Sequence, residues 1–203
     1  MKERVFSKLD GIELSILIAT YIAVTIMAFY APIKIEWVWR VPQVILPFVI
    51  VQVRHESIKR IGLHLKNFFQ NLGVGIATAA LLTVGLAPIY LWLWPPVMPT
   101  SLYFGVWVWA SLFIVTNAFV IELFYRGCLQ PRLKALTGAM PALAITSLLC
   151  GLDFFEFMIF GPITAVLAAV AFGFLYYKTR SLVAPVAAHI LWFLFVMVVV
   201  VST

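Results

Sequence analysis

The sequence predicts an all-α integral membrane protein with about seven transmembrane helices, and three observations support this class. The chain is 64% hydrophobic and only 11% charged, whereas soluble domains carry roughly 25% charged residues. Apolar stretches long enough to cross a bilayer recur along it. Connecting segments rich in Lys and Arg also alternate with connecting segments that contain few basic residues. A soluble globular protein is therefore excluded.

The apolar stretches define the expected helices in chain order. A transmembrane helix needs about 20 mostly apolar residues, and five stretches reach that length: 12–31, 73–94, 103–124, 157–177 and 182–202. Two shorter stretches, 41–53 and 142–152, are expected to cross as well, with an interfacial or re-entrant segment as the alternative. The run that ends at Ala31 is too long for a signal peptide and no A-x-A site follows it, so it is expected to remain as the first helix.

Charge orients these helices. Short cytoplasmic loops carry an excess of Lys and Arg. With seven spans, only Lys34 and Arg40 lie opposite the N-terminus, and removing either short span would disrupt this pattern. The sequence thus predicts a cytoplasmic N-terminus and an outer C-terminus. Topology also accounts for the net charge of +6, and no Lys/Arg-rich run suggests nucleic acid binding. The remaining basic residues share the cytoplasmic side: Lys2, Arg4, Lys8, Arg54, Lys59, Arg60, Lys66, Arg126, Arg132, Lys134, Lys178 and Arg180.

Tryptophan residues form a second pattern on the expected outer side. We interpret them as an aromatic belt at the headgroup level. The alternative is a docking surface for another membrane protein, because residues two apart on a helix point in nearly opposite directions. The partners expected from either interpretation are lipids and other membrane proteins. The residues form three W-x-W pairs: Trp37 and Trp39, Trp92 and Trp94, and Trp107 and Trp109.

Few ionisable residues lie inside the apolar stretches. Glu122 and Arg126 are four apart and share one helix face. His189 lies about two turns into the last span, so it is expected to meet Glu122 at a similar depth. We predict one hydrogen-bonded cluster, which could be structural and lock the helices together, because isolated charges at membrane depth are costly.

The polar residues allow other interpretations. His189 could instead bind a haem or a pigment as a single axial ligand, but no cofactor is expected, and no metal, because neither Cys128 nor Cys150 belongs to a metal-binding pattern. Both cysteines are expected to be inert packing residues. Asp153 and Glu156 are expected to mark a loop.

Two blocks carry a resemblance to a known family. Ile121-Glu-Leu-Phe-Tyr-Arg-Gly, with the Cys-Leu-Gln-Pro-Arg-Leu that follows it, and the stretch from Tyr176 to His189 resemble the CPBP family of CAAX proteases and bacteriocin-processing intramembrane proteases. The resemblance runs from residue 103 to the C-terminus. We therefore expect a single membrane domain, 1–203, in which 1–102 supply N-terminal helices without a recognisable motif and 103–203 form a CPBP-like core.

The resemblance implies roles for individual residues. Glu122 and His189 occupy catalytic positions and Arg126 a structural one. Three other positions depart from the family pattern: Ile121 replaces a glutamate thought to activate water, Phe154 a histidine, and Phe193 an asparagine. Peptide hydrolysis needs a base and donors for the oxyanion. Glu122 and His189 are therefore expected to be vestigial.

These observations lead to a functional hypothesis. The chain is expected to be a multi-pass protein of a prokaryotic cytoplasmic membrane that has lost proteolysis and acts as a scaffold, assembly factor or complex subunit. The first alternative is an atypical active protease that uses Glu122 and His189. The second is a pigment- or haem-binding subunit that uses His189.

Overall fold

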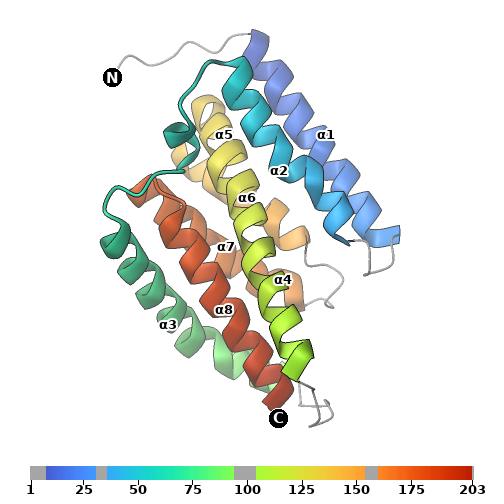
Figure 1. Cartoon of the computed structure of the whole chain (residues 1–203), viewed down its shortest axis with the longest axis vertical. Helices are drawn as coiled ribbons and strands as arrows, with labels where there is room; N and C mark the ends of the chain where they lie inside the picture. Colours follow the sequence, from blue (N-terminus) through green and yellow to red (C-terminus); the bar gives the residue numbers. More distant parts are fainter. Residues whose placement is uncertain (1–7, 31–35, 94–103, 154–159, 203) are drawn as a thin grey trace.

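A computed structural model of the chain describes residues 8–30, 36–93, 104–153 and 160–202. Within these ranges the protein forms seven helices and contains no strand, so the predicted all-α class is confirmed (Figure 1). One of the seven is a continuous helix made of α4, a π-helical turn η3 and α5. A 3₁₀ turn, η2, precedes α3. The elements are α1 Lys8–Tyr30, α2 Glu36–Val53, η2 Ile58–Ile61, α3 Phe68–Leu93, α4 Phe104–Glu122, η3 Leu123–Leu129, α5 Gln130–Thr137, α6 Ala139–Leu152, α7 Phe160–Thr179 and α8 Val183–Ser202.

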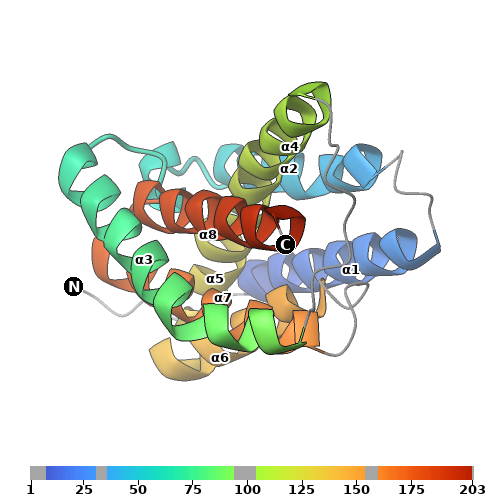
Figure 2. The same ribbon diagram turned by 90° about the horizontal axis from the view of Figure 1, so that it is seen from below.

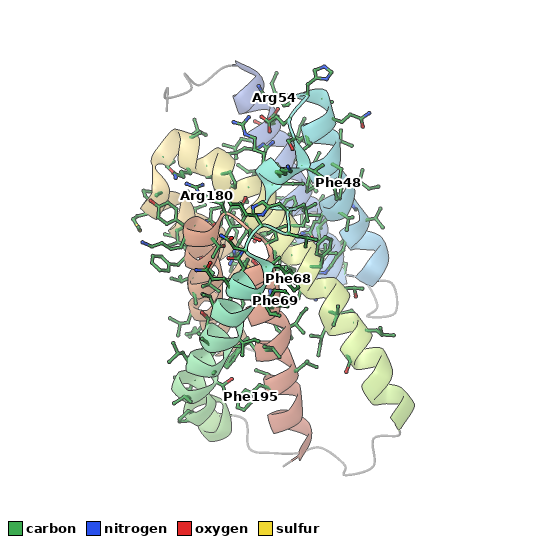
Figure 3. The ribbon with its side chains drawn as sticks, turned by 60° about the vertical axis from the view of Figure 1, so that its left-hand side comes forward. Phe48, Arg54, Phe68, Phe69, Arg180 and Phe195 are labelled. Atoms are coloured by element: carbon green, nitrogen blue, oxygen red, sulfur yellow. The ribbon has the colours of Figure 1, made fainter. Side chains whose placement is uncertain are left out.

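Three helical stretches are long and apolar enough to cross a membrane, namely Phe68–Leu86, Ser111–Thr137 and Pro162–Thr179. Shorter apolar stretches lie in α1, α2, α6 and α8. Large apolar side chains also face outward, among them Phe48 of α2 and Phe69 of α3, which is 85% exposed (Figure 3). Such a surface suits lipid rather than water. The chain is therefore membrane-associated, whereas seven spans and their orientation remain predictions.

The second helix begins earlier than the sequence suggested. The prediction started the stretch at residue 41 and placed Arg40 on the outer side, but α2 starts at Glu36 and carries Arg40 within it. The Arg40 residue is 8% exposed. Pro42 and Pro47 lie inside this helix without ending it. Arg40 consequently belongs to the interior of the protein.

The continuous helix α4–η3–α5 is the central element. Every residue from Ile121 to Gln130 is buried, which requires neighbours on all sides. Figures 1 and 2 show α1 and α2 on one side of this helix and α3 on the other. Helix α3 packs along α8 through small residues: a Cβ atom on Gly75 would lie 2.6 Å from the Ala184 carbonyl oxygen. Close approach of this kind is typical of membrane helix pairs.

The η2 connection fastens the N-terminal half to the C-terminal half. Gly62, whose φ of +86° is left-handed, accepts a hydrogen bond from the Leu182 amide at 3.0 Å. His64 Nε2 lies 3.0 Å from the Arg180 carbonyl oxygen. A Cβ atom on Gly127 would lie 2.8 Å from the Ile61 carbonyl oxygen. The η2 connection thus contacts both η3 and the turn that precedes α8.

Candidate functional site

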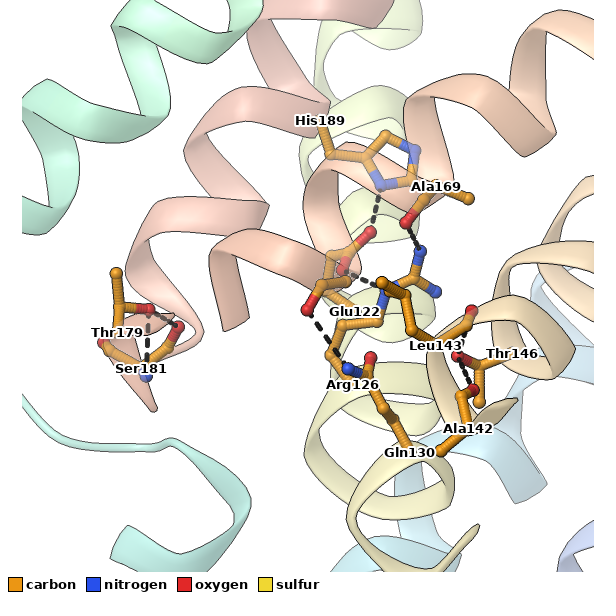
Figure 4. A network of polar contacts seen from close by, with 11 residues as sticks. Glu122, Arg126, Gln130, Ala142, Leu143, Thr146, Ala169, Thr179, Ser181 and His189 are labelled. Atoms are coloured by element: carbon orange, nitrogen blue, oxygen red, sulfur yellow. Dashed lines mark hydrogen bonds and ion pairs between the residues drawn. The ribbon is translucent and has the colours of Figure 1, made fainter. Parts of the chain in front are cut away.

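Three ionisable side chains meet in the interior of the bundle (Figure 4). His189 Nδ1 of α8 lies 2.7 Å from Glu122 Oε1, and Arg126 Nε lies 3.3 Å from Glu122 Oε2. The Glu122 and Arg126 side chains are 0% exposed and the His189 side chain is 3% exposed. The expected contacts among Glu122, Arg126 and His189 are confirmed. Their chemical roles stay predictions.

The π-helical turn shapes this cluster. In η3 the Gln130 amide donates to the Tyr125 carbonyl, five residues back, rather than four as in an α-helix. Arg126 lies within this turn and donates from Nη2 to the Ala169 carbonyl of α7 at 2.6 Å. Its guanidinium therefore connects Glu122 to a third helix. Isolated π-helical turns occur frequently at functional sites.

Two aromatic rings enclose the imidazole of His189. The Phe172 ring of α7 stacks on it with centroids 5.0 Å apart and an interplanar angle of 23°. The Phe193 ring, one turn further along α8, lies at a centroid distance of 5.0 Å and an angle of 40°. With Nδ1 at Glu122 and aromatic rings packed against it, the imidazole has only Nε2 left as a ligand atom for a haem or pigment.

Ile121 and Phe154, the other two positions that depart from the family pattern, do not both lie in the described part of the protein. Ile121 is 0% exposed and belongs to an apolar cluster with Leu17, Tyr21 and Ile50 of the N-terminal helices. Phe154 lies outside the described residues. The six paired tryptophan side chains are also outside the described part, so the outer docking surface stays a prediction.

A second buried polar cluster was not expected from the sequence. Asp153, at the end of α6, accepts hydrogen bonds from Tyr125 Oη at 2.7 Å and from Thr25 Oγ1 at 3.2 Å. Arg40 Nη1 lies 3.8 Å from Asp153 Oδ2 and donates to Gln43 Oε1 at 3.2 Å. The Asp153 side chain is only 4% exposed.

Asp153 lies in the turn that follows α6, which agrees with the predicted loop, but its side chain is buried; Glu156 lies outside the described residues. The side chain is buried because α1, α2 and η3 supply its partners. The sequence did contain one signal, since Arg40 adjoins an apolar stretch and a charge drawn into such a helix needs a counter-charge. Nothing in the sequence paired Arg40 with Asp153.

The chemical capacity of the first cluster follows from its atoms. Among the described residues, no group of three His, Cys, Asp or Glu side chains could hold a metal ion. Glu122 Oε2 has no hydrogen-bond partner in the described part of the chain. A carboxylate with one oxygen held by histidine can accept a proton from water. Two phenyl rings at the imidazole cannot donate to an oxyanion.

A comparison with known families adds one finding. Residues 103–195 match the family model described as type II CAAX prenyl endopeptidase, Rce1-like. This segment contains Glu122, Arg126 and His189 and excludes the N-terminal helices. No curated protein and no solved structure matches the chain.

Proposed function

We propose that this chain, whose residues 103–195 match the family model of Rce1-like type II CAAX prenyl endopeptidases, is a family member that has lost proteolysis. It retains the buried cluster as a structural lock. Its function is that of a scaffold, assembly factor or subunit of a larger membrane protein complex.

The contact between Phe193 and His189 carries this proposal. Hydrolysis of a peptide bond needs a donor for the developing oxyanion beside the reacting carbon, and one such donor contributes roughly 100- to 1,000-fold to turnover. The family resemblance places an amide side chain at residue 193, four residues after the histidine. Phe193 instead packs its ring on the imidazole at 5.0 Å. It supplies apolar surface where hydrolysis requires polarity.

The environment of Ile121 supports the same conclusion. The resemblance assigns this position to a water-activating glutamate, and loss of a general base costs roughly 100-fold or more. Ile121 is 0% exposed and belongs to an apolar cluster that includes side chains of α1 and α2. This environment fits a packing role. A carboxylate there would be desolvated without a partner.

Glu122 also has a structural explanation. Its two oxygens face His189 and Arg126, and Arg126 reaches Ala169. The Glu122 carboxylate thus joins α4 to α8, and the Arg126 guanidinium joins this pair to α7. A lock of this kind can be retained for folding after catalysis is lost.

A peptidase assay tests the proposal. Purified protein is reconstituted in liposomes with a prenylated peptide and a panel of membrane peptides. The wild type, Glu122→Gln and the triple back-substitution Ile121→Glu, Phe154→His, Phe193→Asn are compared. We expect no cleavage above the Glu122→Gln background. Wild-type cleavage that disappears in Glu122→Gln would overturn the proposal.

An atypical protease is the second candidate, and one observation favours it. Within the described residues, Glu122 Oε2 has the 3.3 Å ion pair with Arg126 Nε but no hydrogen bond, so it could hold a water molecule next to His189. The same assay separates the two candidates. Purification in a mild detergent adds an independent criterion, because a subunit should retain a partner in a fixed stoichiometric ratio and a protease should not.

A further inference from the structure

A ladder of polar side chains extends from the buried cluster to one end of the bundle. Four residues spaced by four, Glu122, Arg126, Gln130 and Lys134, lie along η3 and α5. Three of them contact α7 at a constant offset of 43 residues. Arg126 reaches the Ala169 carbonyl at 2.6 Å, Gln130 Nε2 reaches the Gly173 carbonyl at 3.1 Å, and Lys134 Nζ lies 4.7 Å from the Tyr177 ring. The two helices are therefore parallel and in register.

We call the contact between this ladder and α7 the seam. The seam becomes more exposed toward Lys134. Glu122 and Arg126 are 0% exposed and Gln130 is 4% exposed, whereas Lys134 and Tyr177 are half-buried. The neighbours of Lys134 at residues 135–138 are exposed. The ladder therefore leads from the interior to the surface, over a length of about 18 Å at 1.5 Å per residue.

Helix α6 forms a third wall of the seam. Leu143 approaches Gly173 so closely that an added Cβ atom would lie 2.4 Å from Leu143 Cδ1. Gln130 Oε1 and Arg126 Nε lie 3.1 Å and 3.6 Å from the same Cβ position, and Cys150, two turns after Leu143 on α6, is also buried. Ser147 lies between Leu143 and Cys150 on α6 and is 0% exposed.

Several polar atoms along these walls lack a hydrogen-bond partner among the described residues. They are Arg126 Nη1, Gln130 Oε1 and Ser147 Oγ, while Glu122 Oε2 and Arg126 Nε have only the 3.3 Å ion pair that they form with each other. A buried polar group without a partner costs about 1–3 kcal/mol, and native proteins satisfy nearly all such groups, often with ordered water. Three such atoms beside one ion pair indicate a shared occupant rather than separate defects.

From this arrangement we propose that the seam between η3–α5, α6 and α7 binds a chain of ordered water. The water molecules connect the Glu122–His189 pair to the aqueous phase at Lys134 and Tyr177. The spacing suits water, because ladder residues are about 6 Å apart along the helix and one water bridges polar atoms separated by roughly twice a hydrogen-bond length. The buried pair can then exchange protons with bulk water through the seam, whether or not peptides are cleaved.

Thiol accessibility tests the seam. In a background carrying Cys128→Ala and Cys150→Ala, Ser147→Cys places a thiol in the seam. Ala188→Cys of α8 places a matched thiol outside the seam, because Ala188 is also 0% exposed but lies in the apolar cluster that includes Leu86 and Trp192. Silver ion is the probe, since it is small, does not cross bilayers and reacts with thiolate, which forms in contact with water. Unreacted thiol is counted by denaturing alkylation and mass spectrometry.

We expect Ser147→Cys to react at least tenfold faster than Ala188→Cys. Equal rates would overturn the proposal. Ala184→Cys, in the same apolar cluster as Ala188, serves as a second reference if Ala188→Cys does not fold.

The route is tested by closing it. Gln130→Leu replaces the amide in the middle of the ladder with an apolar side chain of similar size, and Gln130→Met is used if the leucine variant is not monodisperse. Either change should slow the reaction of Ser147→Cys with silver ion at least tenfold. An unchanged rate would show that water does not enter from the Lys134 end, and the proposed route would be wrong.

Discussion

Two buried polar clusters adjoin η3, and they are built differently. Consecutive residues of this turn enter different clusters, since Tyr125 reaches Asp153 and Arg126 pairs with Glu122. The Glu122 cluster draws all its described partners from the family-matched segment. The Asp153 cluster takes Thr25 and Arg40 from the N-terminal helices. One cluster therefore holds the matched segment together, and the other joins it to the first half of the chain.

The two clusters compensate their buried carboxylate in different ways. In the Glu122 cluster, a fully buried carboxylate and guanidinium compensate each other within one helical turn. In the Asp153 cluster, two hydroxyl groups satisfy the carboxylate, and the guanidinium is more distant at 3.8 Å. Removing a partner should therefore cost more in the first cluster. Three substitutions test this comparison by their effect on the free energy of unfolding.

Arg126→Ala should have the largest effect. It leaves Glu122 buried without its guanidinium and deprives the Ala169 carbonyl of a donor. Removing one partner of a buried ion pair costs about 3–5 kcal/mol. The measurement is unfolding in mixed detergent and SDS micelles, followed by circular dichroism. Arg126→Lys, which keeps the charge, should recover part of the loss. A change below about 1 kcal/mol would mean that the cluster does not lock the helices.

Asp153→Asn should have an intermediate effect, about 1–3 kcal/mol in the same measurement. The amide retains one acceptor oxygen, but the carboxylate near Arg40 is lost. An effect as large as that of Arg126→Ala would reverse the comparison. It would place the main polar restraint between the two halves of the chain.

Tyr125→Phe should have the smallest effect, about 0.5–1.5 kcal/mol, because it removes a single hydrogen bond to Asp153 and preserves the ring packing. Combining it with Asp153→Asn should give less than the sum of the two effects, since both changes act on one contact. Combining it with Arg126→Ala tests whether the two clusters are independent. Strict additivity in the first pair would show that the hydroxyl contributes nothing through Asp153.

The Glu122 cluster was predictable because local spacing determines most of it. Glu122 and Arg126 share a helix face through their four-residue separation, and the expected span boundaries placed His189 at a similar depth. The stacking of Phe193 on His189 has the same four-residue spacing and could have been inferred. The all-α class followed directly from composition and apolar segment length.

The Asp153 cluster could not be obtained this way. Thr25 and Asp153 are 128 residues apart, and only the packing of α1 beside η3 and α6 brings them together. The start of α2 was misplaced because the predicted stretch included uncharged residues only, whereas Arg40 lies inside the helix and has its counter-charge, Asp153, at the end of α6. The π-helical turn also has no signal in apolar periodicity, since all of its residues are buried.

The four-residue spacing of Glu122 and Arg126 also matters for biogenesis. The ribosome delivers α4 and η3 long before α8, so Glu122 is made while His189 has not yet been synthesised. An isolated carboxylate would oppose entry of this helix into a bilayer. Arg126 emerges one turn later in the same helix and supplies a counter-charge at once. The Arg126 guanidinium thus compensates the charge of Glu122 while the helix enters the bilayer. The imidazole of His189 later joins a carboxylate that is already ion-paired.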